Sequence, residues 1–380
     1  MRRLHTQPRR RTHSAATLWA SLGLAAGLTA TLAGTTTAGA APSGFVSHLA
    51  GTTTIASTVP ANGDVNPYGI VVVPQTTGSL VKGDTLVSNF NDAANLQGTG
   101  TTVVQISPAG AVSTFAQLTG PLAGSCPGGI GLSTALTTLP GGWVVVGSLP
   151  TTDGTSATAQ AGCLIVLNST GHVVETWAGG TINGPWDLTA VSAPWGATIF
   201  VTNVLNGTVG SSPATVDKGT VSRLQVLLGF GSPILFDQCV IANGFAERTD
   251  PAALVVGPTG LALGSRGQLY VADPVKGRIT VVPFATTRFR PAIDGGTTLT
   301  SGGGLNGPLG LALAPGGDVL TVNAGDGNIV ETTPTGHQVA VTQLDPAGAG
   351  GDLFGLTVDA HGTGILFVDD GDNTLKLSGT

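Results

Sequence analysis

Asn and Asp recur in this chain at the ends of short apolar runs, where they are well placed to do chemistry. Oxygen ligands repeated in this way could ring a hard divalent cation such as Ca²⁺. The alternative is structural, because Asn and Asp at strand ends accept hydrogen bonds from turn N–H groups and tolerate unusual backbone angles. One such residue per repeat favours the structural interpretation. The recurring residues are Asn89, Asn203, Asp273, Asn323 and Asp369.

The run from Asp369 to Asn373 (DDGDN) has the composition of a calcium-binding loop, but it lacks the later spacing and the terminal Glu of an EF-hand. We therefore interpret it as a solvated turn. The sequence also contains no Gly-x-Ser-x-Gly elbow, no His-Glu-x-x-His motif and no phosphate-binding loop. We predict no metal and no cofactor, and no residue is assigned a catalytic role.

Six copies of one pattern lead to the fold prediction. Each copy is a turn and an apolar run, then a second apolar run that ends in small or Asn/Asp residues, then a third strand and, in five copies, a fourth. The 59 Gly and 23 Pro suit the many turns that this requires. The six first runs are NPYGIVVVP (66–74), CPGGIGLS (126–133), GPWDLTAV (184–191), GPTGLALG (257–264), GPLGLALAPGG (307–317) and DLFGLTVDAHG (352–362).

Each copy predicts a four-stranded antiparallel sheet with an apolar face that it cannot bury alone. Packing six sheets around an axis buries those faces and leaves short edges. We therefore predict an all-β, six-bladed propeller over 41–380. The sixth copy runs out of chain before its fourth strand, so we predict that the segment within 45–58 pairs with Asn373–Leu377 and completes the last blade.

The segments GPTGLALGSRGQLYVADPVKGRITVVP (257–283) and GPLGLALAPGGDVLTVNAGDGNIVETTPTG (307–336) resemble NHL repeats, which form six-bladed propellers. The resemblance implies that the turn before each innermost strand lines the channel mouth. Similar gluconolactonase-like propellers bind a divalent cation there through Asn, Asp and Glu. This chain has Thr259 and Leu309 at those positions, and neither can replace a carboxylate ligand. Streptogramin-lyase-like propellers need paired His with a Glu, whereas His48, His172, His337 and His361 fall in different repeats.

The same alignment places three aromatic residues at the mouth: Tyr68, Trp186 and Phe354. With Thr259 and Leu309 they would form an aromatic cup for a sugar ring or an apolar side chain. Asp187, which replaces a Gly, would be the nearest acid, although turn capping is an alternative role for it. The alternative for the rings is a plug that merely fills the channel, and their exposure would distinguish the two.

The N-terminus has the features of a signal peptide: the basic segment MRRLHTQPRRR, an apolar stretch over 18–34, and the small residues Ala38-Gly39-Ala40. An uncleaved membrane anchor is the alternative, but the stretch is short and diluted by Ser, Thr and Gly. We predict a signal peptide over 1–40 and a secreted or periplasmic mature chain without a membrane span.

Charge excludes one class of partner. Five Arg precede residue 12, so the rest of the chain carries ten Lys and Arg against 21 Asp and Glu. An acidic surface repels phosphate backbones, and we predict no nucleic-acid partner.

Export also bears on the three cysteines. We predict a disulfide between Cys126 and Cys163, each just before a strand at the same face of the second copy, with Cys239 free. Three buried thiols are the alternative.

Two functions remain. The main hypothesis is a non-enzymatic binding or scaffold module that takes a protein, peptide or carbohydrate ligand at the mouth. The alternative is a lactonase-like propeller hydrolase or lyase with a non-standard site.

Overall fold

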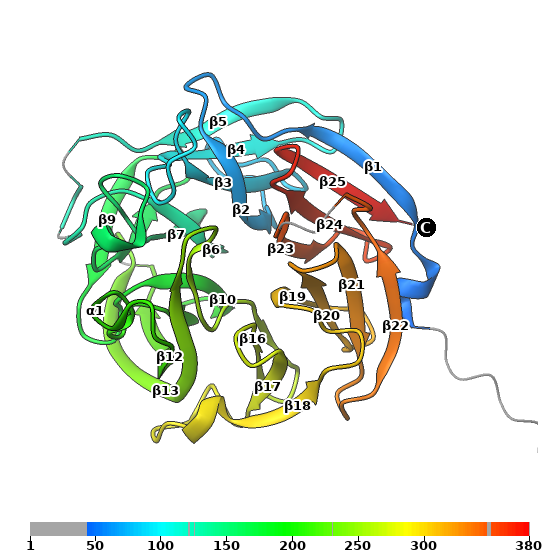
Figure 1. Ribbon diagram of the computed structural model, residues 1–380. Helices are drawn as coiled ribbons and strands as arrows, with labels where there is room; N and C mark the ends of the chain where they lie inside the picture. Colours follow the sequence, from blue (N-terminus) through cyan, green and yellow to red (C-terminus); the bar gives the residue numbers. More distant parts are fainter. Residues whose placement is uncertain (1–43, 121, 125, 230, 348–350, 380) are drawn as a thin grey trace, which may run out of the picture. The chain divides into compact units, whose positions relative to one another are not determined.

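Six antiparallel sheets stand around a common centre in the computed structural model (Figure 1). The structure describes residues 44–379 apart from 121, 125, 230 and 348–350, together with all side chains in that range except those of 133 and 134. The predicted signal peptide over 1–40 therefore lies outside the described residues. The prediction of an all-β, six-bladed propeller is confirmed.

Each of the first three blades is built from consecutive strands that run outward from the centre. They are blade 1 with β2 (Val65–Val72), β3 (Thr85–Asn91), β4 (Thr102–Ile106) and β5 (Val112–Gln117); blade 2 with β6 (Leu132–Leu139), β7 (Trp143–Ser148), β8 (Cys163–Leu167) and β9 (Val173–Ala178); and blade 3 with β10 (Pro185–Ala193), β11 (Gly196–Asn203), β12 (Val216–Leu227), β13 (Ile234–Asp250) and β14 (Leu254–Val256).

The other three blades follow the same order. They are blade 4 with β15 (Leu261–Leu263), β16 (Leu269–Asp273), β17 (Arg278–Val282) and β18 (Thr297–Ser301); blade 5 with β19 (Pro308–Leu313), β20 (Val319–Asn323), β21 (Asn328–Thr332) and β22 (Gln338–Gln343); and blade 6 with β23 (Leu353–Val358), β24 (Gly364–Asp369), β25 (Thr374–Gly379) and β1 (Ala50–Ser57). The helical turns are short: η1 (Phe45–His48), η2 (Ser156–Thr158), α1 (Thr208–Ser211) and η3 (Ile293–Gly295).

The ring is closed by β1, which pairs antiparallel with β25, for example Thr53 with Leu377 and Ser57 with Thr374. The predicted closure is therefore confirmed. The segment before β1 is held to blade 5 by the buried Glu331, whose carboxylate accepts the N–H groups of Phe45 (3.0 Å) and Val46 (2.8 Å). This contact fixes the start of the described chain before it reaches its pairing partner.

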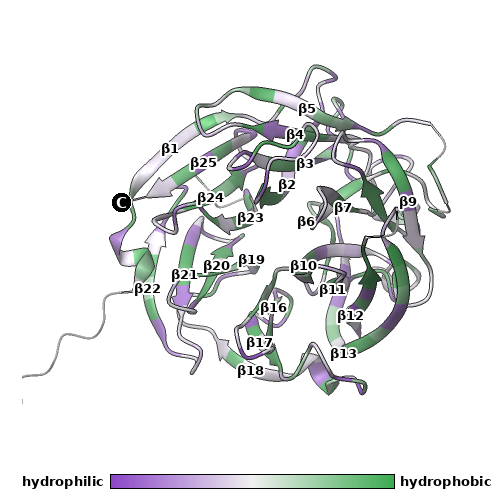
Figure 2. Ribbon diagram, turned by 180° about the vertical axis from the view of Figure 1, so that it is seen from behind, coloured by the Kyte–Doolittle hydropathy of each residue, from purple (hydrophilic) through white to green (hydrophobic). Residues whose placement is uncertain are grey.

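Apolar side chains that alternate along the strands hold neighbouring blades together. In β3, Leu86 packs toward blade 2 while the next residue, Val87, packs toward blade 6. In β7, Val144 and Val145 divide in the same way between blades 1 and 3. The two-residue period of a strand makes this possible, since successive side chains point to opposite faces. Figure 2 shows hydrophobic residues along the strands of every blade.

The second blade begins near the end of the segment that the sequence assigns to its turn and first apolar run (126–133). β6 starts at Leu132, and the Cys-Pro-Gly-Gly residues form the turn before it. There the N–H of Gly129 donates to the carbonyl of Cys126, and Gly129 has a φ of 89°, which glycine adopts without strain. The Pro-Gly-Gly sequence thus ends a loop before the blade begins.

The disulfide prediction is confirmed. Cys126 and Cys163 are bonded with their Cα atoms 5.3 Å apart, and Cys239 is a free thiol. A disulfide persists in oxidising compartments, in keeping with export. Among the residues that the structure describes, none belongs to a helix with the length and apolarity to cross a bilayer.

Candidate functional site: a cavity at the channel mouth

The predicted aromatic residues converge at the end of the channel where the innermost strands begin. Tyr68 stacks on Phe354 with ring centroids 3.7 Å apart, and Trp186 meets Tyr68 edge-on at 5.7 Å. Phe90, which the sequence analysis did not single out, completes the cluster 5.2 Å from Tyr68. Four rings from blades 1, 3 and 6 therefore close the channel.

The exposure of these rings is that of a plug. Tyr68 and Trp186 are 2% and 3% exposed, and of the three predicted rings only Phe354 is half-buried rather than buried. Thr259 is buried and Leu309 half-buried. Of the two alternatives, the burial of Tyr68 and Trp186 favours the plug over an open cup with at least two exposed rings, because the rings pack on one another at the axis. Ligand binding by these residues stays a prediction.

Asp187 does not lie in the mouth cavity. It lines the channel on the other side of the rings, in a cavity of about 440 Å³ walled by the innermost strands. Its carboxylate accepts the N–H of Leu188 (2.8 Å) and the N–H of Leu261 (3.0 Å) in the next blade. Burial raises the pKa of Asp187 to about 7 despite these bonds. The bond to Leu261 ties the innermost strand of blade 3 to that of blade 4.

A second cavity, of about 260 Å³, lies on the loop side of the rings. Tyr68, Trp186 and Phe354 form its apolar floor, and loops from several blades form its walls. Such a concave site with an apolar base and a few polar groups is typical of small-molecule binding. The polar residues that line it are Asn66, Gln97, Arg248 and Asp370.

Three of these residues have a buried polar atom without a hydrogen-bond partner among the described residues: Asn66 Oδ1, Gln97 Oε1 and Arg248 Nη1. Gln97 Nε2 donates to the carbonyl of Ala252, and Arg248 Nη2 pairs with Asp250. Leaving a buried polar group unpaired costs about 1–3 kcal/mol, so these atoms indicate a bound ligand or water.

Asp370 directly follows β24, which runs toward the mouth. Burial raises its pKa to about 6, and the nearby carboxylates of Asp352 and Asp369 add to the shift. Tyr68 keeps its phenolic proton, because burial and then the charge of Asp370 raise its pKa well above the usual value. The mouth thus combines a carboxyl group that titrates near pH 6 with a phenol that stays protonated.

The rest of the acidic run is a turn, as the sequence analysis expected. Lys376 binds the carboxylates of Asp369 and Asp372, the latter at 2.8 Å, and the Asp369 carboxylate also accepts the N–H of Gly371. Asp370 alone of this run lines the cavity.

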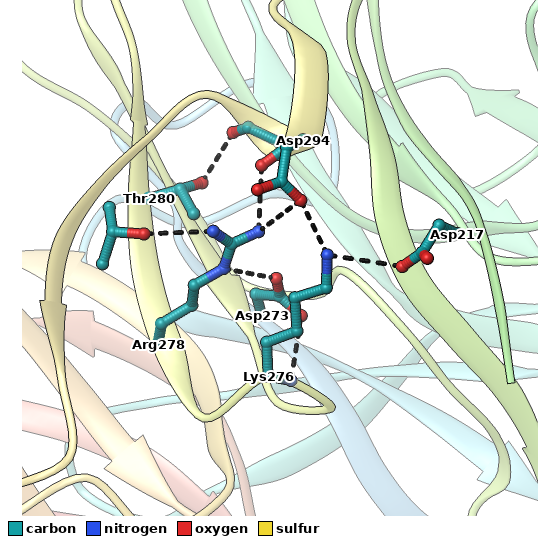
Figure 3. A network of polar contacts seen from close by, with 8 residues as sticks. Asp217, Asp273, Lys276, Arg278, Thr280 and Asp294 are labelled. Atoms are coloured by element: carbon teal, nitrogen blue, oxygen red, sulfur yellow. Dashed lines mark hydrogen bonds and ion pairs between the residues drawn. The ribbon is translucent and has the colours of Figure 1, made fainter.

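The recurring Asn and Asp residues are structural too. Asn89 donates to the carbonyl of Thr58, and Asn323 donates to that of Gly304. Asp273 pairs with Arg278 at 2.8 Å, and Arg278 also reaches Asp294 in a network that extends through Lys276 to Asp217 of blade 3 (Figure 3). These residues hold turns and blades rather than a ligand.

The gluconolactonase-like resemblance implies a divalent cation at the mouth. In the part of the chain that the structure describes, no group of three or more His, Cys, Asp or Glu is placed to hold a metal ion. The carboxyl group of Asp370 shares the cavity with the cationic Arg248, which opposes a second positive charge. The residues present therefore do not fit such an ion.

A buried carboxyl group beneath the mouth loops predicts a pH effect on stability. Glu247 Oε1 accepts the hydroxyl of Thr208, while Oε2 has no partner among the described residues. Burial raises the pKa of Glu247 to about 7. The folded protein holds the proton of Glu247 more tightly than the unfolded chain does. The contribution of this proton to the free energy of unfolding is therefore complete below the ordinary pKa of about 4.5 and is lost as the pH rises through 7.

We expect Glu247→Gln to remove this part of the pH dependence, which is about 3 kcal/mol at most. Denaturant unfolding of the wild type and of the variant at pH 5 and pH 8 measures the effect. Asp318→Asn, at a half-exposed hairpin position, is the control. If the free energy of unfolding changes by the same amount between pH 5 and pH 8 in the wild type and in Glu247→Gln, then Glu247 does not titrate in this range.

The site residues differ in how visible they are in the sequence. Asp370 follows a recognised strand end, and Asn66 precedes the first Pro-Tyr-Gly turn. Gln97 lies in a loop and Arg248 near the end of the long β13, where no repeat marks them. The cavity walls could therefore not be read from the repeats.

The fold and the cavity define a class: a six-bladed propeller with a small-molecule-sized cavity at its mouth.

No protein-family model and no curated protein sequence matches the chain, so the NHL resemblance stays a prediction. A gluconolactonase from Xanthomonas campestris is similar in structure, with 15% identity and a TM-score of 0.54 over 87% of this chain and 90% of that one. A luciferin-regenerating enzyme has 10% identity and a TM-score of 0.51 over 85% and 94%. A streptogramin B lyase has 13% identity and a TM-score of 0.46 over 86% and 96%. At these identities the likeness establishes the fold alone.

Proposed function

We propose that this propeller hydrolyses a small ester, with a lactone as the first class to test, in the mouth cavity. The observation that carries the proposal is Asp370, a carboxyl group with a pKa of about 6 in a small cavity that also holds unpaired polar atoms. A general base works best when its pKa lies near the operating pH. The likeness to a gluconolactonase, a hydrolase by its name, supports the same class.

In the proposed reaction, ionised Asp370 removes a proton from a water molecule as the water attacks the ester carbonyl. The protonated phenol of Tyr68 donates a hydrogen bond to the oxygen on which charge develops. The carbonyl then re-forms, the ring C–O bond breaks, and the departing alkoxide takes from Asp370 the proton that Asp370 removed from the water, which restores the ionised base. The product is a hydroxy acid, and Arg248 Nη1 is the group that would bind its carboxylate.

Binding without turnover is the second candidate. The apolar ring floor favours it, since such a floor holds a ligand's apolar face without taking part in chemistry. Both candidates use the same cavity, so the experiment must separate binding from catalysis.

The test follows the release of acid from a panel of five- and six-membered lactones with purified protein. We expect Asp370→Asn to lower kcat by about a hundredfold or more, the usual effect of removing a general base. The rate should rise with pH through about 6 and then level off, because the base acts when it is deprotonated. Asp318→Asn serves as the control.

Activity that survives unchanged in Asp370→Asn would exclude Asp370 as the base. Binding of panel members by calorimetry without hydrolysis would favour the binding module instead.

A further inference from the structure

The face of the molecule opposite the mouth exposes large apolar side chains. The five most exposed among the described residues all belong to blades 3 and 4: Trp195, Phe236, Phe284, Phe289 and Ile293, at 58–82% exposure. Trp195 lies in the β10–β11 hairpin, Phe236 next to the β12–β13 turn, and the others in the loop between β17 and β18. In an antiparallel blade these connections start at the end away from the mouth, and the last loop lies at the outer rim beside β13 (Figure 1).

Contacts to neighbouring strands hold this loop in place. Arg223 Nη1 in β12 donates to the carbonyls of Thr286 (3.0 Å) and Arg288 (2.9 Å). The guanidinium of Arg223 also lies 5.3 Å from the centre of the Phe289 ring. Further along, Ala292 exchanges backbone hydrogen bonds with β13. The exposure of Phe284 and Phe289 is therefore fixed by ordered structure, and ordered apolar side chains in solvent mark interaction sites.

Positive charge gathers at the same place. Arg223, Arg266, Arg288 and Arg290 are four of the ten Lys and Arg that follow residue 40. Arg266 lies in the β15–β16 turn, whose Gly267 carbonyl accepts the N–H of Ala285 in this loop. None of the four makes an ion pair within the described part of the chain, where the observed ion pairs use Arg248, Lys276, Arg278 and Lys376.

We define the basal patch as Trp195, Phe236, Phe284 and Phe289 with Arg266, Arg288 and Arg290. Arg223 is buried and holds the loop from beneath, so it is not part of the exposed patch. The segments that carry the patch contain two acids: Asp237, beside Phe236, and Asp294, whose carboxylate pairs with Lys276 and Arg278. The basal patch thus carries a local positive charge on a chain that is otherwise acidic, with 21 Asp and Glu. Charge complementarity therefore indicates an anionic occupant.

We propose that the basal patch docks this protein onto an anionic lipid bilayer. Aromatic side chains such as Trp and Phe are stable at the boundary between headgroups and acyl chains, while Arg binds lipid phosphates. Trp195 projects from the tip of the β10–β11 hairpin, and Phe284 and Phe289 are exposed in the loop between β17 and β18, where they are free to contact a surface. With the mouth on the opposite face, the cavity stays open to water while the protein is docked. This proposal does not depend on the proposed hydrolysis.

The test measures co-sedimentation of the whole mature chain with vesicles of phosphatidylglycerol and, separately, of phosphatidylcholine. We expect binding to the anionic vesicles that weakens as salt is raised, and little binding to the zwitterionic ones. Trp195, at 69% exposure, should report the event through a blue shift in fluorescence, since Trp177 and Trp186 are buried and Trp143 is half-buried. The shift should disappear in Trp195→Phe.

Variants separate the apolar from the ionic part of the interaction. Two double variants should each weaken binding to anionic vesicles about tenfold or more. The first removes apolar side chains (Phe284→Ser with Phe289→Ser), and the second removes positive charge (Arg266→Gln with Arg290→Gln). The matched controls, Val341→Ser on the outer strand of blade 5 and Lys218→Gln on β12, should bind like the wild type. All variants are checked for an unchanged melting temperature, and only those that pass are compared.

Absence of wild-type binding to both kinds of vesicle would overturn the proposal, as would controls that weaken binding equally. Light scattering of the free protein tests the other occupant. A dimer in solution that is lost in the Phe284→Ser, Phe289→Ser variant would assign the basal patch to a second copy of this chain and would also refute bilayer docking.

Discussion

A chain that starts at residue 60 should fail to unfold cooperatively and should aggregate, whereas a chain that starts at residue 41 should not. The shortened chain lacks β1, which supplies six paired residues to β25, and it lacks the segment that Glu331 holds. With about 1 kcal/mol for each backbone hydrogen bond, the loss reaches roughly 5 kcal/mol or more, which is comparable to the stability of an ordinary domain. It also exposes the edge of β25, a template for pairing with other chains.

Urea unfolding followed by circular dichroism, together with light scattering, measures both effects. Glu331→Gln in the longer chain provides a graded comparison, because it weakens the contact to Phe45 and Val46 but keeps β1; it should lower stability by about 1–2 kcal/mol. If the chain from residue 60 stays monomeric with an unchanged midpoint, β1 does not stabilise the ring.

Replacing Cys126 and Cys163 together with Ser should lower the free energy of unfolding by about 4 kcal/mol. The estimate rests on the sequence separation of 37 residues, because the bond restricts the unfolded chain by an entropy that grows with the logarithm of that separation. The bond also joins the loop before β6 to the start of β8, so its loss frees the beginning of blade 2. Guanidinium unfolding of the oxidised wild type and of the double variant gives the difference.

Cys239→Ser is the matched control, since Cys239 is the free thiol. It should change stability by much less than the double variant, and reducing agent should destabilise the wild type and Cys239→Ser alike. If the double variant and the wild type had the same stability under oxidising conditions, the cross-link would contribute nothing to folding.

The repeats were sufficient for the fold because the features that define a blade are local. Alternating apolar residues such as Leu86 and Val87 specify a strand buried on both faces, and the turns between strands specify the meander. In the second copy the Cys-Pro-Gly-Gly turn was recognised in the same way as the turns before the other innermost strands. The exact start of the strand was not, since β6 begins at Leu132, six residues after Cys126.

The candidate site was predicted only in part. The convergence of Tyr68, Trp186 and Phe354 followed from their equivalent places in three repeats, yet their burial did not. Asp187 was expected beside them at the mouth, but it follows Trp186 in a strand, where successive side chains point in different directions. It therefore lines the channel, and Asp370 takes the place expected for it in the mouth cavity.

The sequence by itself determined the number of blades, the strand that closes the ring and the pair of cysteines that bond, because each depends on patterns within one repeat or on counting repeats. Tertiary structure decided which polar residues share a site. Asn66 and Gln97 come from blade 1, Arg248 from blade 3 and Asp370 from blade 6, so no local pattern connects them. They meet because the closed ring brings the mouth loops of distant blades to one axis, where the four packed rings leave room above them for a ligand.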